Sequence, residues 1–492
     1  MQSLVSTKWI FWIKWLLSLC LSCIKHGVHL YSLLDALTRI QKDKIAVIID
    51  DQSIPYSALK QRTDQLIHLW NSPENSPLLP QQIGLLLQQN LDGLASLFAL
   101  SRLGKDIIIL NPNLVIDKLH ALIEQKQPYL IGNLTTLNQL QVKNSFAIPT
   151  VQDLAQDQQY SPIQAVSIRP YYFNKISVCS SGSTGVPKVA TRKSNPLQSL
   201  PLLDLLLRKL KFLKIQKIFV MTPICHAAGL TASLMAFSFN KTVILQQRFN
   251  AKTASQLIEQ HQIDSLNLVP TILYRLLTSN APLKPVKYII SGSAPLSRHL
   301  ILQLVKEYSN IQLFNLYGSS ETGINLFATP DDLKSHPESI GKAIKGVEVK
   351  IADHDGNILA PEQIGTLWTK CAWSIRPNQW MHCGDLAMYD QHGYFYLKGR
   401  QDDMLICGGI NIYPIDLENI LYQHPAIQYA QAYAISDHEL GQCLAVNVIL
   451  KSSIEIVELH DWISHHAPRY LRPKTIQIIE NIATDSIGKP IQ

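Results

Sequence analysis

The sequence predicts an α/β protein, with a large N-terminal body of parallel-rich sheets covered by helices and a small C-terminal α+β domain on a hinge. From Ile45 onward, short apolar runs alternate with longer helical patterns, which favours parallel sheets with helices on both faces. Near residue 400 this alternation gives way to charged residues and a Gly-Gly pair. The 492 residues, 46% of them hydrophobic, suffice for two or three domains and a large core.

The strands are expected where apolar runs are short and continuous. These runs are IAVIID at 45–50, QIGLLL at 82–87, DIIIL at 106–110, KIFVM at 217–221 and TVILQ at 242–246. Longer patterns predict helices, for example from Leu91 to Leu103 and from Ala254 to His261. The polar stretch 71–82 predicts a surface loop.

Residues 1–28 form a basic, apolar N-terminal segment. The run from Trp9 to Ile24 is interrupted by Lys14 and is shorter than the ~20 apolar residues of a spanning helix. No A-x-A-like signal-peptide cleavage site follows it. Its tryptophans and lysines predict a helix lying in a membrane interface. The alternative is a first helix packed on the body of the protein.

The charge of the chain limits the kinds of partner that it can bind, and its cysteine content indicates its cellular compartment. Lys and Arg exceed Asp and Glu by 44 − 37 = 7, and this surplus is spread along the chain. This surplus suits anionic ligands or an acidic membrane surface. The sequence has neither zinc-finger spacing nor an arginine-rich stripe, so we do not expect it to bind nucleic acid. The eight cysteines are scattered, and the CxxC of Cys20 and Cys23 lies in an apolar stretch typical of buried thiols. We expect a cytoplasmic protein. If the N-terminal helix lies in a membrane interface, the protein is peripheral on the inner face of the cytoplasmic membrane.

The predicted boundary lies at 400–402, within LKGRQDDMLICGGINIYP. A charged, non-periodic joint between a large body and a small tail is typical of a hinge. The predicted domains are therefore 29–399 and 400–492, after the N-terminal segment.

The first chemistry-bearing segment is VCSSGSTGVPKVATRK at 178–193. Its small residues let the backbone wrap closely around a polyphosphate, and its hydroxyls and amides supply hydrogen-bond donors. The G-K-[ST] ending of a Walker A loop is absent. Such a loop is often only a loop, but the order SSGSTGxPK is more particular. The candidate phosphate-binding residues are Ser181, Gly182, Ser183, Thr184, Gly185 and Lys188.

Three further segments add to this one. In NLYGSSETG, Tyr317 suits stacking on a planar base and Glu321 offers a carboxylate to the Mg²⁺ that accompanies ATP. In HCGDLAMYDQHGYFYLKGRQDD, Asp385 suits accepting two hydrogen bonds from ribose hydroxyls, with the charge of Arg400 beside it. In DSIGKPIQ, Lys489 would on its own be a solubilising charge.

These four segments, in this order and spacing, resemble the adenylate-forming superfamily of acyl-CoA synthetases, peptide-synthetase adenylation domains and luciferases. The match runs from about Leu30 to Lys489, and ALSRLGKDIIILNP and NLYGSSE look most like bacterial fatty-acyl-CoA synthetases. The resemblance implies that 181–188 holds the pyrophosphate end of ATP and that Tyr317 covers the adenine beside SGSAP at 291–295. The other ATP-binding residues that it implies are Ser293, Ala294, Pro295, Gly318, Ser319, Ser320, Asp385 and Arg400.

The same resemblance assigns the remaining roles. Lys489 would be the adenylating lysine, Glu321 and Thr184 the Mg²⁺ ligands, and Asp402 the hinge. Gly408 and Gly409 match the loop that the superfamily brings to the active site for the thiol step. His226, in TPICHAAGL, stands where acyl-CoA synthetases often carry a histidine beside the carboxylate pocket. The alternative is a hydrogen-bonded core histidine.

The predicted function is ATP-dependent ligation of a carboxylic acid, a long-chain fatty acid by preference, to CoA through acyl-AMP. ATP, Mg²⁺ and CoA are the implied cofactors and substrates. Peptide-synthetase domains carry an aspartate for the substrate amine, and no acid lies between Thr222 and Asn240. Three alternatives stay open: an enzyme that loads an acyl carrier protein, an aryl-acid–CoA ligase, and a non-catalytic membrane-associated binder.

The sequence departs from the superfamily pattern in places. Val189 replaces a glycine, Cys383 a threonine and Ala483 a proline, and the stretch from Lys370 to Met381 is shorter than usual. These departures bear on rate and on the shape of the acyl pocket, whereas all the named polar groups are present.

Overall fold

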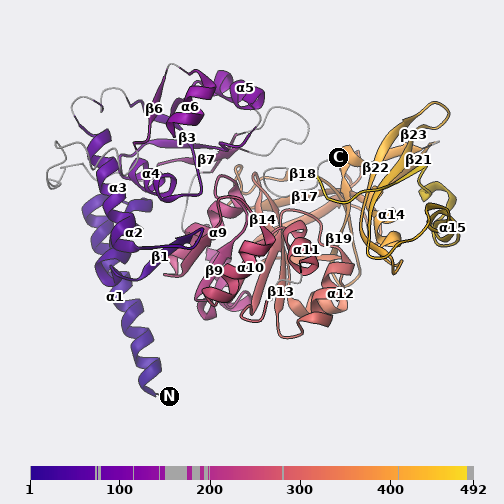
Figure 1. Ribbon diagram of the computed structural model, residues 1–492, viewed down its shortest axis with the longest axis horizontal. Coiled ribbons are helices and arrows are strands. Elements are labelled where there is room, and N and C mark those ends of the chain that lie inside the picture. The colour runs from indigo at the N-terminus through magenta and orange to yellow at the C-terminus, as the bar shows by residue number, and fades with distance from the viewer. Residues whose placement is uncertain are drawn as a thin grey trace. The chain divides into compact units, whose positions relative to one another are not determined.

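The structure is a computed structural model that divides into two compact units (Figure 1). The first comprises 1–196, 211–267 and 281–286, and the second 197–210, 268–280 and 287–492. Residues 2–484 are described except 73–74, 76–78, 115, 143, 150–173, 180–188, 193–197, 199, 280–281 and 408. At 2–10 and 189–192 only the backbone is described.

The first unit contains two groups of mainly parallel strands. One has the order β6 (Ser145–Ala147), β5 (Tyr129–Gly132), β3 (Gln82–Leu86), β4 (Asp106–Leu110), β7 (Ile176–Cys179) and β8 (Val189–Arg192). The other has the order β2 (Gln52–Pro55), β1 (Ile45–Ile49), β10 (Thr242–Leu245), β9 (Lys217–Val220) and β11 (Ser265–Leu268). The pairs β7–β8 and β1–β2 are antiparallel and the other pairs are parallel. All five predicted strands are present, as β1, β3, β4, β9 and β10.

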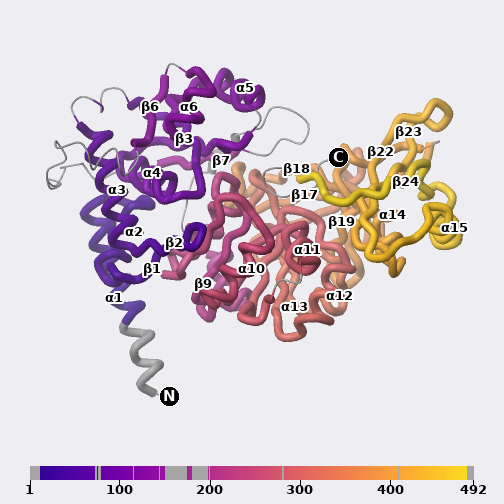
Figure 2. The backbone as a smooth tube through the Cα atoms, in the orientation of Figure 1, coloured from indigo at the N-terminus to yellow at the C-terminus, as the bar shows by residue number. Residues whose placement is uncertain are grey.

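Helices follow the strands of this unit, and α2, α3 and α4 pack together (Figure 2). The helices are α1 (Gln2–His26), α2 (Leu30–Gln41), α3 (Tyr56–Trp70), α4 (Leu91–Arg102), α5 (Ile116–Lys126), α6 (Leu134–Leu140), α9 (Ala227–Ser238) and α10 (Ala251–Gln260). Asparagines begin three of them, since Asn90, Asn133 and Asn250 each accept a backbone N–H of the first turn. Such a cap contributes about 1 kcal/mol.

Between residues 288 and 400, the second unit has one parallel pair of strands followed by antiparallel strands. The order is β12 (Tyr288–Gly292), β13 (Gln312–Ser319), β14 (Gly323–Ala328), β15 (Ser339–Ala343), β19 (Phe395–Arg400), β18 (Met381–Tyr389), β17 (Gly365–Cys371) and β16 (Val347–Ala352). Only β12 and β13 in this series are parallel. The helices are α8 (Leu200–Asp204), α11 (Pro270–Thr278), α12 (Arg298–Glu307) and α13 (Pro330–Ser335).

The C-terminal part of this unit is a small α+β fold with its own core. Its sheet has the order β21 (Ile410–Ile412), β20 (Leu405–Cys407), β23 (Gly441–Leu450) and β22 (Ile427–Asp437), with β24 (Thr475–Ile478) parallel to β23. The helices α14 (Pro414–Leu421) and α15 (Ile456–His466) cover it with buried side chains that include Leu417, Leu421, Leu459 and Ile463. The predicted fold class, a large α/β body with a small C-terminal α+β domain, is confirmed.

Candidate active site

Tyr317, Asp385 and Arg400 meet in the second unit. The Tyr317 hydroxyl, on β13, donates a hydrogen bond to Oδ2 of Asp385 on β18. Asp385 and Arg400 are cross-strand partners, and Arg400 Nη1 lies 3.4 Å from Asp385 Oδ1. The same nitrogen donates to the carbonyl of Cys383 at 3.4 Å. The structure thus holds the predicted ribose carboxylate between a phenol and a guanidinium.

The protonation of this cluster follows from burial. Burial, and then the neighbouring Cys383 and Asp385, raise the pKa of Tyr317 well above its ordinary value. The phenol therefore remains a hydrogen-bond donor at neutral pH. Burial also raises the pKa of the Cys383 thiol to about 11, so that this departure from the family pattern leaves a neutral side chain.

Gly384 permits the close approach of Arg400. Its φ is +77°, and a Cβ at this position would lie 2.8 Å from Arg400 Nη2. A side chain here would be strained by the backbone and would also displace the guanidinium.

The SGSAP and NLYGSSETG segments are neighbours because β12 and β13 are parallel. Gly292 pairs with Leu316, so that Ser293, Ala294 and Pro295 leave β12 beside the residues that follow Leu316. Ser293 adopts φ +68°. At Gly318, a Cβ would lie 1.9 Å from the carbonyl oxygen of Gly323, so only glycine fits this close backbone approach.

The turn after Tyr317 presents Glu321. Ser319 Oγ accepts the backbone N–H groups of Glu321 at 3.2 Å and Thr322 at 3.0 Å. The N–H of Ile375 donates to the Glu321 carbonyl at 2.9 Å, which fixes the backbone of this turn from a second side. The Glu321 side chain is partly exposed, and it belongs to no ion pair among the described residues. A carboxylate in this setting fits a ligand of ATP-bound Mg²⁺.

His226 lies in the first unit as the residue that precedes α9. It is buried, and its Nε2 lies 3.4 Å from Nδ2 of Asn111, the residue directly after β4. Gln89 fixes the same loop, since its Oε1 accepts the N–H of Ile224 at 2.7 Å and its Nε2 donates to the carbonyl of Gln246 at 2.6 Å. Asn111 and Gln89 are not among the residues predicted for the site from the sequence. Both are polar residues that closely follow buried parallel strands, and that position is the signal that would have identified them.

The C-terminal part places the remaining described residues. Asp402 is exposed within a 3₁₀ turn at Gln401–Asp403, and Gly409 is exposed with φ +86°. Arg275 of α11, which the sequence did not single out, donates from Nη2 to the Ile482 carbonyl at 3.1 Å and to Thr484 Oγ1 at 3.2 Å.

Several predicted residues lie outside the described part of the chain. They are Ser181, Gly182, Ser183, Thr184, Gly185, Lys188, Gly408 and Lys489. The strands that flank the first segment are described, and Cys179 of β7 pairs with Val189 of β8. Cys179 and Val189, which flank this segment, are therefore adjacent, with Val189 in the strand.

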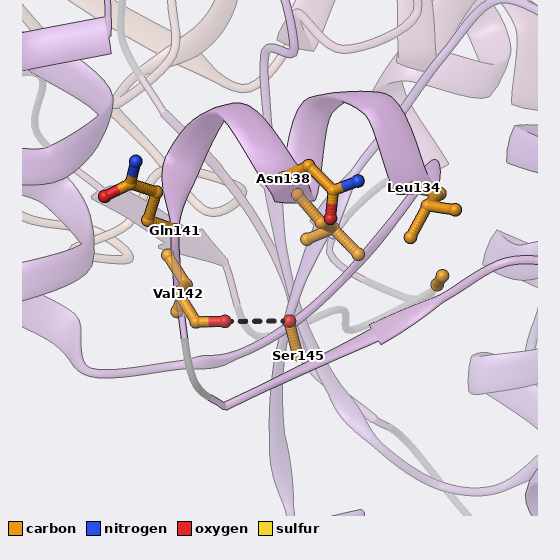
Figure 3. A pocket seen from close by; sticks show the side chains of 7 residues that line it. Leu134, Asn138, Gln141, Val142 and Ser145 are labelled. Carbon is orange, nitrogen blue, oxygen red and sulfur yellow. Dashed lines mark hydrogen bonds between the residues drawn. The ribbon is translucent and has the colours of Figure 1, made fainter.

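A pocket of about 420 Å³ lies elsewhere in the first unit, between α6 and β6 (Figure 3). Its lining includes Leu134, Asn138 and Gln141, and the Ser145 hydroxyl donates to the Val142 carbonyl at 3.0 Å. It contains none of the predicted site residues and no ionisable side chain.

Comparison with known families decides the identity. The model of the AMP-binding enzyme family matches residues 35–376, and that of the AMP-binding enzyme C-terminal domain matches residues 416–489. The chain belongs to the AMP-binding enzyme family. The predicted membership of the adenylate-forming superfamily is confirmed, whereas a particular likeness to fatty-acyl-CoA synthetases is not.

Two relatives from Bacillus subtilis show how far the similarity of this AMP-binding enzyme extends. The 2-succinylbenzoate–CoA ligase is 24% identical over 479 residues, which cover 92% of this chain and 94% of that protein. An uncharacterised acyl–CoA ligase is 27% identical over 319 residues, which cover 63% of this chain and 65% of that protein. A solved structure of o-succinylbenzoate CoA synthetase from the same organism, in complex with ATP and magnesium ion, has a TM-score of 0.77 at 21% identity, over 93% of this chain and 98% of that one.

Proposed function

We propose that this AMP-binding enzyme is an AMP-forming acid–CoA ligase whose acid is aromatic and of the 2-succinylbenzoate type. The observation that carries the proposal is the end-to-end similarity to a 2-succinylbenzoate–CoA ligase, which includes the C-terminal domain. The fatty-acid preference expected from the sequence has no counterpart in the relatives described above. The similarity favours the aryl-acid alternative.

The described residues suit the adenylate half of such a reaction. The ribose hydroxyls of ATP would donate to Asp385, whose carboxylate Tyr317 and Arg400 hold from two sides. The Tyr317 ring suits the adenine, since Gly318 lets the backbone approach closely. Glu321 would hold the Mg²⁺ that accompanies ATP. When bound, this ion would neutralise part of the negative charge of the phosphates.

In the first half-reaction, a carboxylate oxygen of the acid attacks the α-phosphorus of ATP, and pyrophosphate leaves. Both reactants are anionic, so preorganised positive charge at the α-phosphate stabilises the transition state. Lys489 is the residue assigned to that role. In the second half-reaction, the CoA sulfur attacks the acyl carbon and AMP leaves with the bonding electron pair.

His226 and Asn111 are the proposed polar contacts of the acid in the first unit. Both side chains are buried, and their nitrogens Asn111 Nδ2 and His226 Nε2 lie close together, where they could hydrogen-bond to the acid. A buried polar pair next to an apolar helix such as α9 suits an acid with an aromatic body and a polar end.

A two-stage assay tests this proposal. ATP–pyrophosphate exchange is measured with 2-succinylbenzoate, with benzoate and with palmitate, and AMP release is then measured after addition of CoA. We expect exchange with 2-succinylbenzoate to exceed exchange with palmitate, and AMP release to need CoA. Preferential exchange with palmitate would refute the aromatic acid while retaining the ligase. AMP release that needs an acyl carrier protein in place of CoA would refute the thiol assignment, and absence of exchange with every acid would refute the ligase itself.

A further inference from the structure

The first helix, α1, carries an exposed apolar face. Ile13, Leu16, Leu17, Leu21 and Ile24 are each 57–74% exposed, and Cys20 between them is also exposed. Their spacing of three and four residues places all six on one side of the helix. We call this set the α1 stripe. Exposed apolar side chains are normally scattered, so a continuous row of this kind marks an interaction surface.

The opposite face of α1 fixes the direction of the stripe. Ser18 Oγ donates to the Ala36 carbonyl of α2 at 3.0 Å, and Ser22 Oγ donates to Asp35 Oδ2 at 2.6 Å. Both serines are buried, and the ring of Trp12 packs edge-on against Phe239. Turning the helix to bury the stripe would break these buried hydrogen bonds, and leaving such groups unpaired costs about 1–3 kcal/mol each. The packing therefore holds the stripe outward.

The charge of α1 indicates what covers the stripe. Its 25 residues include three lysines and no Asp or Glu. Lys14 lies one turn before Leu17 and Lys25 one turn after Leu21, and both are exposed. The two cations therefore lie along one edge of the stripe, where long lysine side chains reach the headgroup level of a bilayer. A second copy of α1 would bring lysines against lysines, without an acidic partner on either helix.

The geometry points to α1 as a membrane-interface helix: we propose that the α1 stripe inserts into the surface of an anionic lipid bilayer, with Lys14 and Lys25 at the phosphate groups. The stripe spans about 16 Å along the helix, roughly half the hydrocarbon thickness of a bilayer. Among the described residues, no helix is both long and apolar enough to cross a membrane. The helix lies along the surface and anchors the enzyme peripherally.

Vesicle binding by the full-length protein tests this proposal. Co-sedimentation is measured with vesicles of phosphatidylcholine alone and of phosphatidylcholine mixed with phosphatidylglycerol. We expect binding to the mixed vesicles, and a loss of roughly tenfold or more in the double variant Leu17→Gln/Leu21→Gln. The matched control is Ile358→Gln/Val457→Gln, which removes two exposed apolar side chains elsewhere and should bind like the wild type. Equal binding by both double variants would overturn the proposal.

Charge and protection provide two further readouts. Lys14→Glu/Lys25→Glu should abolish the preference for phosphatidylglycerol, whereas Lys118→Glu/Lys252→Glu, with the same change of net charge at exposed positions, should retain it. Cys20 lies in the stripe, so its alkylation by a water-soluble thiol reagent should slow when mixed vesicles are added. Unchanged alkylation would contradict insertion. Dimerisation that Leu17→Gln/Leu21→Gln abolishes would show that a second copy covers the stripe instead, and would also overturn the proposal. ATP–pyrophosphate exchange with a soluble acid should be equal in all these variants.

Discussion

The Tyr317 hydroxyl donates its hydrogen bond to Asp385, and this contact joins β13 to β18 at the site where we propose that the nucleoside of ATP binds. Asp385 also faces Arg400, so the phenol and the guanidinium occupy different oxygens of one carboxylate. The carboxylate is thereby oriented before any ligand arrives. Preorganisation of this kind reduces the cost of ordering on binding.

Tyr317→Phe should raise the KM for ATP about tenfold while changing kcat little. The variant retains the ring but removes the donor, and a hydrogen bond to a charged group contributes about 1.5–3 kcal/mol. Steady-state ATP–pyrophosphate exchange measures both constants. Tyr308→Phe, at a position away from this site, serves as the control. An unchanged KM for ATP would show that the Tyr317 hydroxyl does not orient the carboxylate.

Gly384→Ala should weaken ATP binding through Arg400. The added Cβ would meet the guanidinium at 2.8 Å, in addition to the strain of φ +77°. Gly393 has the same φ and no atom within 4 Å of an added Cβ, so Gly393→Ala carries the backbone strain alone. Both variants should lose about 1–2 kcal/mol of stability in thermal melts. Only Gly384→Ala should raise the KM for ATP, and equal effects of the two variants on KM would refute the role of the contact.

Arg275→Ala should slow adenylation by roughly tenfold and leave thioester formation from supplied acyl-AMP unchanged. Arg275 donates hydrogen bonds to Ile482 and Thr484, the second of which lies five residues before Lys489. We infer that these contacts help to position the lysine proposed for adenylation. Lys489→Ala should reduce adenylation further, by about a hundredfold or more, and also spare the second step. Arg298→Ala, which removes an exposed arginine of α12, is the control. Equal loss of both half-reactions in Arg275→Ala would indicate a structural role only.

Glu418→Gln should stabilise the C-terminal domain above about pH 7. Burial raises the pKa of Glu418 to about 7, while its Oε1 accepts the Ala432 N–H at 2.9 Å. A raised pKa means that the folded state binds the proton more tightly. The contribution of Glu418 to stability is therefore present at acid pH and lost as pH rises through about 7. Glutamine keeps the acceptor without the charge, so the variant should gain on the order of 1–3 kcal/mol at about pH 8 and little at about pH 5.

Thermal unfolding at the two pH values checks this prediction. Glu439→Gln, at an exposed carboxyl of the same domain, should change neither melting temperature. A gain of the same size at both pH values would show that Glu418 does not titrate between them.

The fold was predictable from the sequence because its strands are apolar runs buried on both faces. The runs IAVIID, QIGLLL and DIIIL form β1, β3 and β4. The charged residues near residue 400, where the apolar alternation ends, form the 3₁₀ turn at 401–403. Tyr317, Asp385 and Arg400 were predictable from motifs. The proximity of Arg400 to Asp385 was also predicted, and the pairing of β18 with β19 provides it. The hydrogen bond from Tyr317 to Asp385 was not predicted, because it joins residues 68 positions apart and no local pattern specifies it. Asn111 and Arg275 were missed for the same reason, since their partners lie 115 and 207 residues away.

For the N-terminal segment, the composition indicated a helix but could not show which of its faces packs on the protein. Composition predicted an interfacial helix and left a packed helix open. One face of α1 packs on α2, and the face that we propose for the membrane is the opposite one. The serines Ser18 and Ser22 pack on α2, whereas the α1 stripe faces outward. Average hydrophobicity cannot separate these faces, but the position of two serines among the leucines can.

Asp402, the predicted hinge, lies in the 3₁₀ turn Gln401–Asp403. Proline at 402 would disfavour the helical conformation of Gln401, which is part of the 3₁₀ turn, because proline restricts the residue before it. Proline at 401 has the opposite effect. Arg400 is already extended, at φ −75° and ψ 148°, and Gln401 opens the turn, where proline fits. Gln401→Pro should therefore favour the described backbone, in which Arg275 holds the segment that precedes Lys489, whereas Asp402→Pro should disfavour it.

We expect Gln401→Pro to retain ATP–pyrophosphate exchange while thioester formation falls by an order of magnitude or more, with acyl-AMP accumulating on the enzyme. Asp402→Pro should reduce exchange instead. If the two variants behaved alike, with melting temperatures like that of the wild type, rotation at these residues would not separate the two half-reactions.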